Sequence, residues 1–167
     1  MRVLVTAASR HGATAEIGEA IADELRTVGL EAEFHRPEDV ASVVPYDAVV
    51  LGSAIYTGRW LESARRFTER QQPVLRGRPT WLFSSGPIGE PLTPTEEPAD
   101  GRRLLADLGA REHRVLAGKL NPEDLGWVER TITGMLKAPG GDFRDWDEIR
   151  AWARTIAAAL ETAAVRR

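Results

Sequence analysis

The amino-acid sequence predicts a three-layer α/β fold, in which a five-stranded parallel sheet carries helices on both faces. Short aliphatic runs such as Val3–Val5 and Ala48–Leu51 have the composition of strands that are buried on both sides. Between such runs lie longer stretches whose apolar residues are spaced as on one face of a helix. The alternation repeats about five times along the chain, which is the pattern of a parallel sheet covered by helices.

In the first half of the chain, strands are expected at Val3–Val5 and Leu30–His35, with a helix between them. Gly29 is the expected stop of that helix, because glycine suits the left-handed position after a helix end. Asp39–Val44 is expected to add a short helix closed by Pro45. The apolar face of the first helix consists of Ile17, Ile21, Leu25 and Val28.

The second half continues with strands at Ala48–Leu51, Trp81–Phe83 and Arg114–Ala117. Residues 86–101 are rich in proline and glycine and are expected to form a long loop, and loops of this length are often functional. A short helix is expected at Arg102–Leu108. The inner faces of the two longer helices consist of Leu61, Ala64 and Phe67 in one, and of Ile149, Trp152, Ala153, Ile156 and Leu160 in the last.

One segment, Gly118–Gly141, does not fit the simple alternation of strand and helix. Its apolar residues are spaced as in an additional amphipathic helix, which Pro139-Gly140-Gly141 would close. These apolar residues are Leu125, Val128, Ile132, Met135 and Leu136. We therefore expect a single domain over residues 1–167, with a helical insertion at 118–141.

Composition and charge narrow the possible functions. A net charge of −3, with no sustained run of one sign, gives no electrostatic reason to expect nucleic acid as a partner. The chain contains no cysteine, so a redox function would need a bound cofactor in place of thiol chemistry. His35 and His113 stand alone, so no metal site is expected. The sequence shows neither a signal peptide nor a stretch of the ~20 apolar residues that span a bilayer, so a cytoplasmic protein is expected.

The most informative segment, Ser9–Thr14, lies between the first strand and the first helix. A helix start leaves about four N–H groups unpaired and carries a partial positive charge, which together suit a phosphate. The dinucleotide pattern G-x-G-x-x-G and the Walker lysine motif are both absent, which favours a mononucleotide phosphate. The alternative is an ordinary capping loop, in which Ser9 or Thr14 only caps the helix. The expected phosphate-binding residues are Ser9, Arg10, His11, Gly12, Ala13 and Thr14.

This loop resembles the S/T-x-T-G-x-T phosphate loop of the flavodoxins, with Ser9, Gly12 and Thr14 matching and His11 replacing the middle threonine. The resemblance implies the strand order 2-1-3-4-5 with FMN at the switch point of the sheet, an arrangement for which flavodoxins are themselves the standard example. It also implies that the loops after the third and fourth strands flank the flavin ring. Those loops comprise Ala54, Ile55, Tyr56, Thr57 and Gly58, and Ser84, Ser85, Gly86, Pro87 and Ile88.

Several side chains near these loops have two interpretations. Tyr56 and Trp60 are both candidates to pack on a face of the ring. Tyr56 is the better one, because most aromatic residues belong to cores and Trp60 is also expected as a core residue of the helix that follows. Backbone amides of both loops are expected to hydrogen-bond the pyrimidine edge of the ring, and Gly58 would let a peptide reorient. A protonated His11 side chain would strengthen phosphate binding, but the side chain is expected to face solvent while the His11 amide binds the phosphate.

The chain also resembles the menaquinone-dependent protoporphyrinogen dehydrogenase branch of the flavodoxin superfamily. Arg10, the loop Tyr56–Gly58, and an insertion that ends in Gly140-Gly141 before Asp145-Trp146 carry this resemblance. It implies an enzyme of haem biosynthesis that oxidises a porphyrinogen and reduces a quinone. The insertion would then either form a wall of the substrate site or simply pack at the edge of the sheet.

Three other functions compete with this one. A non-enzymatic electron shuttle is an alternative, although a net charge of −3 is weak for steering onto a basic partner. A fold that has lost its flavin also stays open, because His11 departs from the usual motif. A receiver domain is rejected, because the acids it needs for Mg²⁺ are missing from Val5-Thr6-Ala7 and Leu51-Gly52-Ser53.

Near the last helix, a cluster of acidic residues is expected to stabilise the positive end of the helix. The cluster consists of Asp142, Asp145, Asp147 and Glu148. The sequence leaves the oligomeric state open, as well as any peripheral membrane contact of the insertion.

Overall fold

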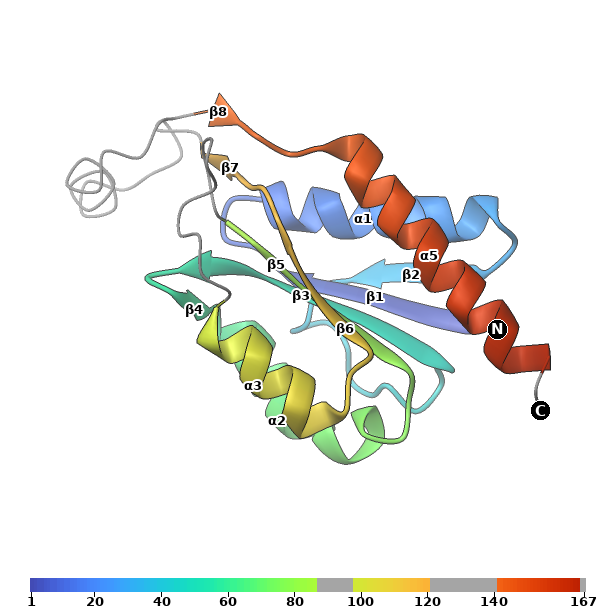
Figure 1. Ribbon diagram of the computed structural model, residues 1–167. Helices are drawn as coiled ribbons and strands as arrows, with labels where there is room; N and C mark the ends of the chain where they lie inside the picture. Colours follow the sequence, from blue (N-terminus) through green and yellow to red (C-terminus); the bar gives the residue numbers. More distant parts are fainter. Residues whose placement is uncertain (87–97, 121–140, 166–167) are drawn as a thin grey trace.

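The structure is a computed structural model and describes residues 1–86, 98–120 and 141–165. Helices and strands alternate along the chain, and Figure 1 shows helices on both sides of a central sheet. The strands are β1 (Arg2–Ala8), β2 (Glu31–His35), β3 (Ala48–Tyr56), β4 (Arg59–Trp60), β5 (Thr80–Ser85), β6 (Glu112–Leu116), β7 (Lys119–Leu120) and β8 (Gly141–Asp142). The helices are α1 (Ala13–Thr27), α2 (Glu62–Leu75), α3 (Ala99–Leu108) and α5 (Trp146–Val165).

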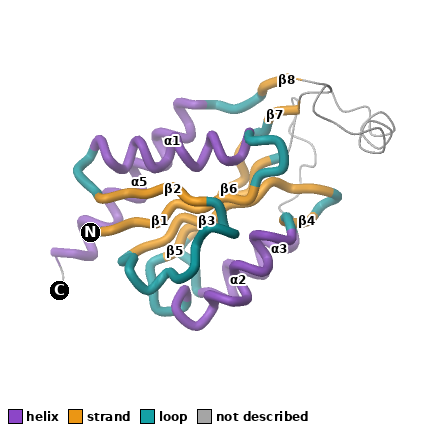
Figure 2. Tube along the Cα trace, turned by 180° about the vertical axis from the view of Figure 1, so that it is seen from behind, coloured by secondary structure: helices purple, strands orange, loops and turns teal. Residues whose placement is uncertain are grey.

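Five parallel strands form the sheet in the order β2-β1-β3-β5-β6, and β4 pairs antiparallel with the end of β3. Counted along the parallel strands, this is the predicted order 2-1-3-4-5. Helices α1 and α5 cover one face, and α2 and α3 cover the other (Figures 1 and 2). The predicted three-layer α/β architecture is confirmed.

Strand β1 shows why the central strands have unbroken aliphatic sequences. Val3 and Val5 join the core beneath α1 and α5, whereas Leu4 joins the core beneath α2 and α3. All three side chains are fully buried. Since burial of each such side chain is worth ~1.5–3 kcal/mol, both faces of the strand contribute to stability.

Helix α1 ends where the sequence predicts. Gly29 has a φ of 88°, in the left-handed region that favours glycine. Its N–H donates to the Arg26 carbonyl at 3.0 Å, and the Leu30 N–H donates to the Leu25 carbonyl at 3.1 Å. These two bonds form a Schellman motif, which satisfies the last carbonyls of the helix.

The short helix expected at Asp39–Val44 is wrong, because this segment forms turns. Gln71 of α2 supplies the physical reason. Its side-chain amide donates to the Ala41 carbonyl at 3.0 Å and accepts from the N–H of the buried Val43 at 3.3 Å. A contact with α2 thus provides hydrogen bonds that a helix would have made within the segment.

Two predicted boundaries also differ from the structure. Helix α3 begins at Ala99, three residues before the predicted start at Arg102. Pro98 precedes it as the N-cap with a φ of −56°, and proline is tolerated at a helix start because no partner is needed there for its missing N–H. Strand β6 begins and ends slightly earlier than the predicted Arg114–Ala117.

The predicted helix of the insertion falls at 121–140, outside the described residues. Its described flanks, β7 and β8, pair antiparallel, with Lys119 opposite Asp142 and Leu120 opposite Gly141. The single domain over residues 1–167 stays a prediction.

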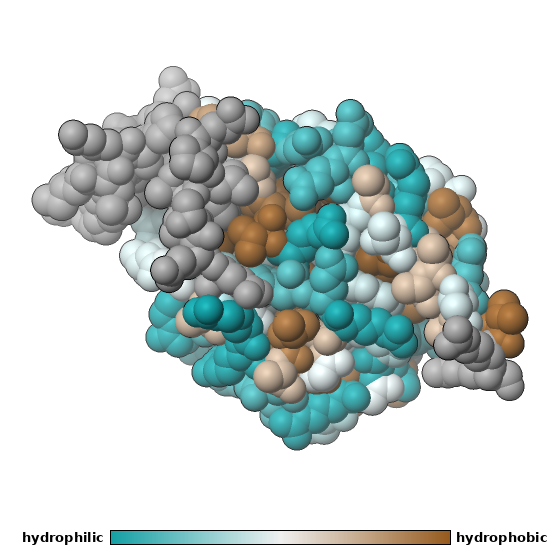
Figure 3. Space-filling view, viewed as in Figure 1, coloured by the Kyte–Doolittle hydropathy of each residue, from teal (hydrophilic) through white to brown (hydrophobic). Residues whose placement is uncertain are grey.

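Surface composition is mixed on the face shown in Figure 3, where hydrophobic side chains lie in separate groups among hydrophilic ones. Over the part of the chain that the structure describes, no helix has the length and apolar character needed to cross a bilayer.

Strand β2 is tied to β1 by an ion-pair cluster around Glu33. The Glu33 carboxylate accepts hydrogen bonds from Arg2 Nη2 at 2.9 Å and from the Tyr46 hydroxyl at 3.0 Å, and His35 Nε2 lies 3.2 Å away. The bond from Arg2 contributes most, with those from His35 and Tyr46, to lowering the pKa of Glu33 from 4.5 to about 2.

We therefore expect that the free energy of unfolding of Glu33→Gln depends less on pH, in the acid range, than that of the wild type. Because the pKa of Glu33 is lowered in the folded state, its contribution is present above about pH 4.5 and is lost as pH falls toward about 2. The contribution is small, since the side chain is 40% exposed. Urea unfolding should show the variant less stable than the wild type near neutral pH and equal to it at about pH 2. Glu31→Gln on the same strand should keep the wild-type profile, and a pH-independent deficit in Glu33→Gln would contradict this assignment.

Candidate functional site

Three loops meet at the carboxyl edge of the sheet, following β1, β3 and β5. Together with the segment after β6 they line a concave cleft that is partly open to solvent. The lining residues are Ser9, Arg10, His11, Ala13, Thr14, Ala54, Ile55, Tyr56, Leu61, Ser85, Gly86, Gly118 and Lys119.

The first loop leads directly into the N-terminus of α1. Gly12 is the N-cap residue, and its φ of 91° is a conformation that favours glycine. Thr14 is almost fully buried, and its N–H donates to Ser9 Oγ at 3.2 Å. Ser9 therefore does cap the helix, as the alternative interpretation expects. Because the positive end of α1 opens on a cleft lined by Ala13 and Thr14, the donors present also fit a phosphate.

The second loop is a tight β-hairpin that the sequence did not predict. Strands β3 and β4 pair through Ile55 with Trp60 and Tyr56 with Arg59. The two residues between them, Thr57 and Gly58, have φ values of 49° and 76°. Two left-handed residues suit a two-residue hairpin turn, but a β-branched residue in this region costs ~1–3 kcal/mol. The surrounding contacts must therefore hold the turn in place.

Trp60 supplies much of that support through its buried side chain. Its side chain is 2% exposed, and its Nε1–H donates to Ser84 Oγ at 2.7 Å. Ser84 Oγ lies 2.8 Å from His113 Nε2, so the hairpin is linked through β5 to β6. The hydroxyl of Ser53 accepts the Leu61 N–H at 2.9 Å. Trp60 is thus a core residue as expected, but it belongs to β4 instead of the helix that follows.

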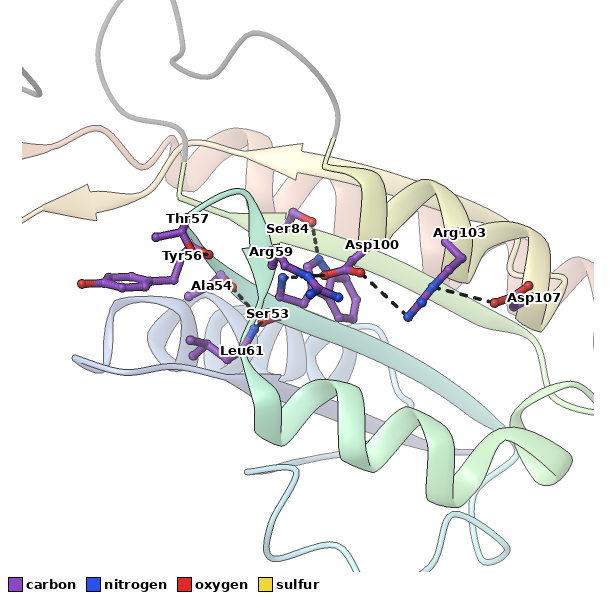
Figure 4. Close-up of polar contacts among 11 residues, drawn as sticks. Ser53, Ala54, Tyr56, Thr57, Arg59, Leu61, Ser84, Asp100, Arg103 and Asp107 are labelled. Atoms are coloured by element: carbon purple, nitrogen blue, oxygen red, sulfur yellow. Dashed lines mark hydrogen bonds and ion pairs between the residues drawn. The ribbon is translucent and has the colours of Figure 1, made fainter. Parts of the chain in front are cut away.

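Asp100 of α3 is a buried carboxylate that also holds this hairpin. Its Oδ2 accepts the Trp60 N–H at 3.0 Å. Arg59 Nε lies 3.6 Å from the carboxylate and Arg103 Nη2 lies 3.8 Å from it (Figure 4). A hydrogen bond and two nearby cations together stabilise a charge that burial would otherwise disfavour. The sequence analysis did not identify Asp100. The only signal for it in the sequence is its position just after Pro98, at the start of a helix.

The third loop closely approaches the second loop and the segment after β6 through its backbone. Ser85 and Gly86 line the cleft. A Cβ at Gly86 would lie 3.1–3.2 Å from atoms of Ile55, and one at Gly118 would lie 3.0 Å from the Gly86 Cα. Larger residues at these two glycines would therefore push apart the strand ends that form the floor of the cleft.

The structure brings together most of the predicted site residues. The first and second loops are also joined directly, because the Arg10 guanidinium lies over the Tyr56 ring at 4.8 Å. The predicted residues that do not line the cleft are Gly12, Thr57, Gly58 and Ser84, which shape or support it. Pro87 and Ile88 lie outside the described residues. The cleft also includes three residues that were not predicted to bind the cofactor. Leu61 was placed only on the inner face of a helix, and Gly118 and Lys119 were placed in the insertion 118–141.

An open parallel sheet with a cleft at its switch point defines a nucleotide-binding type of α/β fold. The chain belongs to the flavodoxin domain family, which it matches over residues 4–147. It is 28% identical to the protoporphyrinogen IX dehydrogenase [quinone] of Escherichia coli K12, over 94% of this chain and 95% of that protein. The family predicted from the loop motifs is confirmed, and the chain is similar to a protein of the predicted branch.

Solved structures agree on the fold. A flavodoxin from the domain Archaea superposes with a TM-score of 0.69 at 16% identity, over 96% of this chain and 99% of that one. The rubredoxin oxygen:oxidoreductase of Desulfovibrio gigas also gives 0.69, at 14% identity, over 96% of this chain and 36% of that one. At these identities the likeness concerns the fold alone.

The contacts of Asp100 predict a specific loss of stability in Asp100→Ala. The substitution leaves the buried Trp60 N–H without its acceptor, so we expect a loss of ~1–3 kcal/mol in the free energy of unfolding. Asp107→Ala on the same helix removes an exposed carboxylate 4.0 Å from Arg103, and it should change stability by less than ~0.5 kcal/mol. Urea denaturation measures both. Equal losses in the two variants would show that Asp100 does not anchor the hairpin.

Proposed function

We propose that this chain is an FMN-binding oxidoreductase that oxidises a porphyrinogen with a quinone as electron acceptor. The observation that carries the proposal is the cleft itself, where the N-terminus of α1 faces the ends of β3 and β5. Membership of the flavodoxin domain family supports a flavin. Similarity to the E. coli quinone-dependent dehydrogenase along nearly the whole of both chains supports this substrate and acceptor.

The phosphate of FMN would be held by the first loop, Ser9–Thr14. The amides of Ala13 and its neighbours and the Thr14 hydroxyl would donate to the phosphate. Ser9 already accepts from the Thr14 N–H, so its hydroxyl hydrogen is the part that can turn toward an anion. Gly12 sets the turn that aims these groups into the cleft.

The flavin ring would lie between the second and third loops, against residues 54–58 and 84–88. Backbone N–H groups there would hydrogen-bond its pyrimidine edge. Tyr56 is the candidate for contact with a ring face, and because Arg10 lies over one face of the tyrosine, the flavin would use the other or displace Arg10. Bound FMN would supply reversible transfer of electrons and protons between an organic substrate and a quinone.

A flavodoxin-type electron shuttle is the second candidate. Membership of the flavodoxin domain family supports it. Net charge speaks against it, since −3 gives little electrostatic steering toward a basic partner. Arg10 and Lys119 are two cations that line the cleft. Their charges oppose the acidic surface that a shuttle would use to attract a basic partner.

Titration with FMN tests the cofactor proposal. The purified protein should show a flavin spectrum or acquire one with FMN, and Thr14→Val should weaken binding by ~1–3 kcal/mol if the hydroxyl is a buried phosphate donor. Thr27→Val, at the opposite end of α1, removes a hydroxyl that bonds the Glu24 carbonyl and should leave FMN affinity unchanged. A wild-type protein that never binds FMN would refute the proposal, and unchanged affinity in Thr14→Val would refute the role of that residue.

Turnover distinguishes the enzyme from the shuttle. The isolated FMN-loaded protein should oxidise protoporphyrinogen when a menaquinone analogue is present, as followed by the fluorescence of the porphyrin. Protein from which FMN has been removed is the matched control and should be inactive. If the protein turns over only when a reductase partner supplies electrons, it is a shuttle and the enzymatic proposal fails.

A further inference from the structure

Arg144, in the segment between β8 and α5, reaches the first turn of α1. Its side chain is 3% exposed. Nη1 donates to the Ala13 carbonyl at 3.1 Å and to Glu16 Oε2 at 2.6 Å. Ala13 is the first residue of α1 and lines the cleft, and Glu16 stands in the same first turn. A residue far along the chain is thus fixed to the helix end that faces the cleft.

The rest of the guanidinium is equally well fixed. Nε and Nη2 bind the two oxygens of Asp142 at 2.8 and 2.7 Å, and the guanidinium lies 4.5 Å from the centre of the Trp146 ring. These contacts raise the pKa of Arg144, chiefly through Asp142, and the hydrogen bond from Arg144 lowers the pKa of Asp142. The arginine is therefore charged and held in one orientation, as a bidentate pair requires.

This position affects the charge at the start of α1. A carboxylate in the first turn of a helix is favourable while the positive end is free, but it repels an anion bound at the same end. Glu16 is such a carboxylate, and Arg144 is the cation bound to it. Without Arg144, the carboxylates of Glu16 and Asp142 would both lose this partner close to the phosphate loop.

We infer that Arg144 is a positioning residue of the phosphate site, which holds the first turn of α1 and offsets the charge of Glu16 so that a phosphate dianion can bind. This inference rests on the proposed FMN function. It predicts that Arg144 acts on the phosphate and not on the ring, so it contributes to the preference for FMN over riboflavin, which lacks the phosphate.

A double-mutant cycle separates this role from simple structural support. The variants are Arg144→Gln, Glu16→Gln and the double variant, and the measurement is the dissociation constant for FMN and for riboflavin. Arg144→Gln should weaken FMN roughly five- to tenfold, the range expected for one uncompensated charge near a partly exposed site, and change riboflavin less than about twofold. Glu16→Gln should bind FMN at least as well as the wild type. The double variant should recover most of the lost affinity, because the repelling carboxylate is gone.

Three results would overturn the inference. One is unchanged FMN affinity in Arg144→Gln, another is an equal loss for FMN and riboflavin, and the third is a double variant no better than Arg144→Gln. If Arg144→Gln does not fold, Arg144→Lys takes its place in the cycle, with a smaller FMN-specific loss expected since lysine keeps the charge but not the bidentate geometry. Failure of the underlying function is distinguishable, because then the wild type itself would not bind FMN.

Discussion

Parallel pairing of all five main strands is the constraint on which the site depends. Strands that run in one direction end at one edge, and β3 lies between β1 and β5, so the loops after these three strands must be neighbours. The chain leaves β1 for α1 on one face and leaves β3 for α2 on the other (Figure 2). The connections diverge at this point, and a crevice opens between them. The position of the cleft therefore follows from strand order before any side chain is considered.

The first and second loops of the cleft are each held in place by a buried charged side chain. Arg144 binds the first turn of α1 from the α5 side of the sheet, and Asp100 binds the β3–β4 hairpin from the α3 side. Both charges have bonded partners, which burial of an ion requires. The turn at Thr57 is strained, so it depends on such anchoring more than an ordinary hairpin does. Rigid support of this kind reduces the ordering that a ligand would otherwise have to impose on the loops.

Local sequence patterns predicted the elements whose hydrogen bonds are local. Gly29 ended α1 as expected, since the Schellman bonds involve only nearby residues. The helix at 39–44 failed because its hydrogen-bond partner, Gln71, lies on another element. The two-residue strand β4 is too short to show any period, so its Trp60 was assigned to the next helix. In both cases a contact with another element, and not the local sequence pattern, determined the secondary structure.

The same distinction between local and tertiary contacts applies to the site. Ser9, Gly12 and Thr14 could be recognised because the start of one helix sets their roles. In the acidic cluster before α5, the local pattern explains one residue and not another. Asp145 does cap the helix, accepting the N–H groups of the first turn at 2.9–3.0 Å, as the charge pattern predicts. Asp142 instead binds Arg144, whose other partners stand at the opposite end of the chain. Motifs therefore identify which ligand a loop suits, whereas the charges that adjust its affinity come from contacts that only the folded chain brings together.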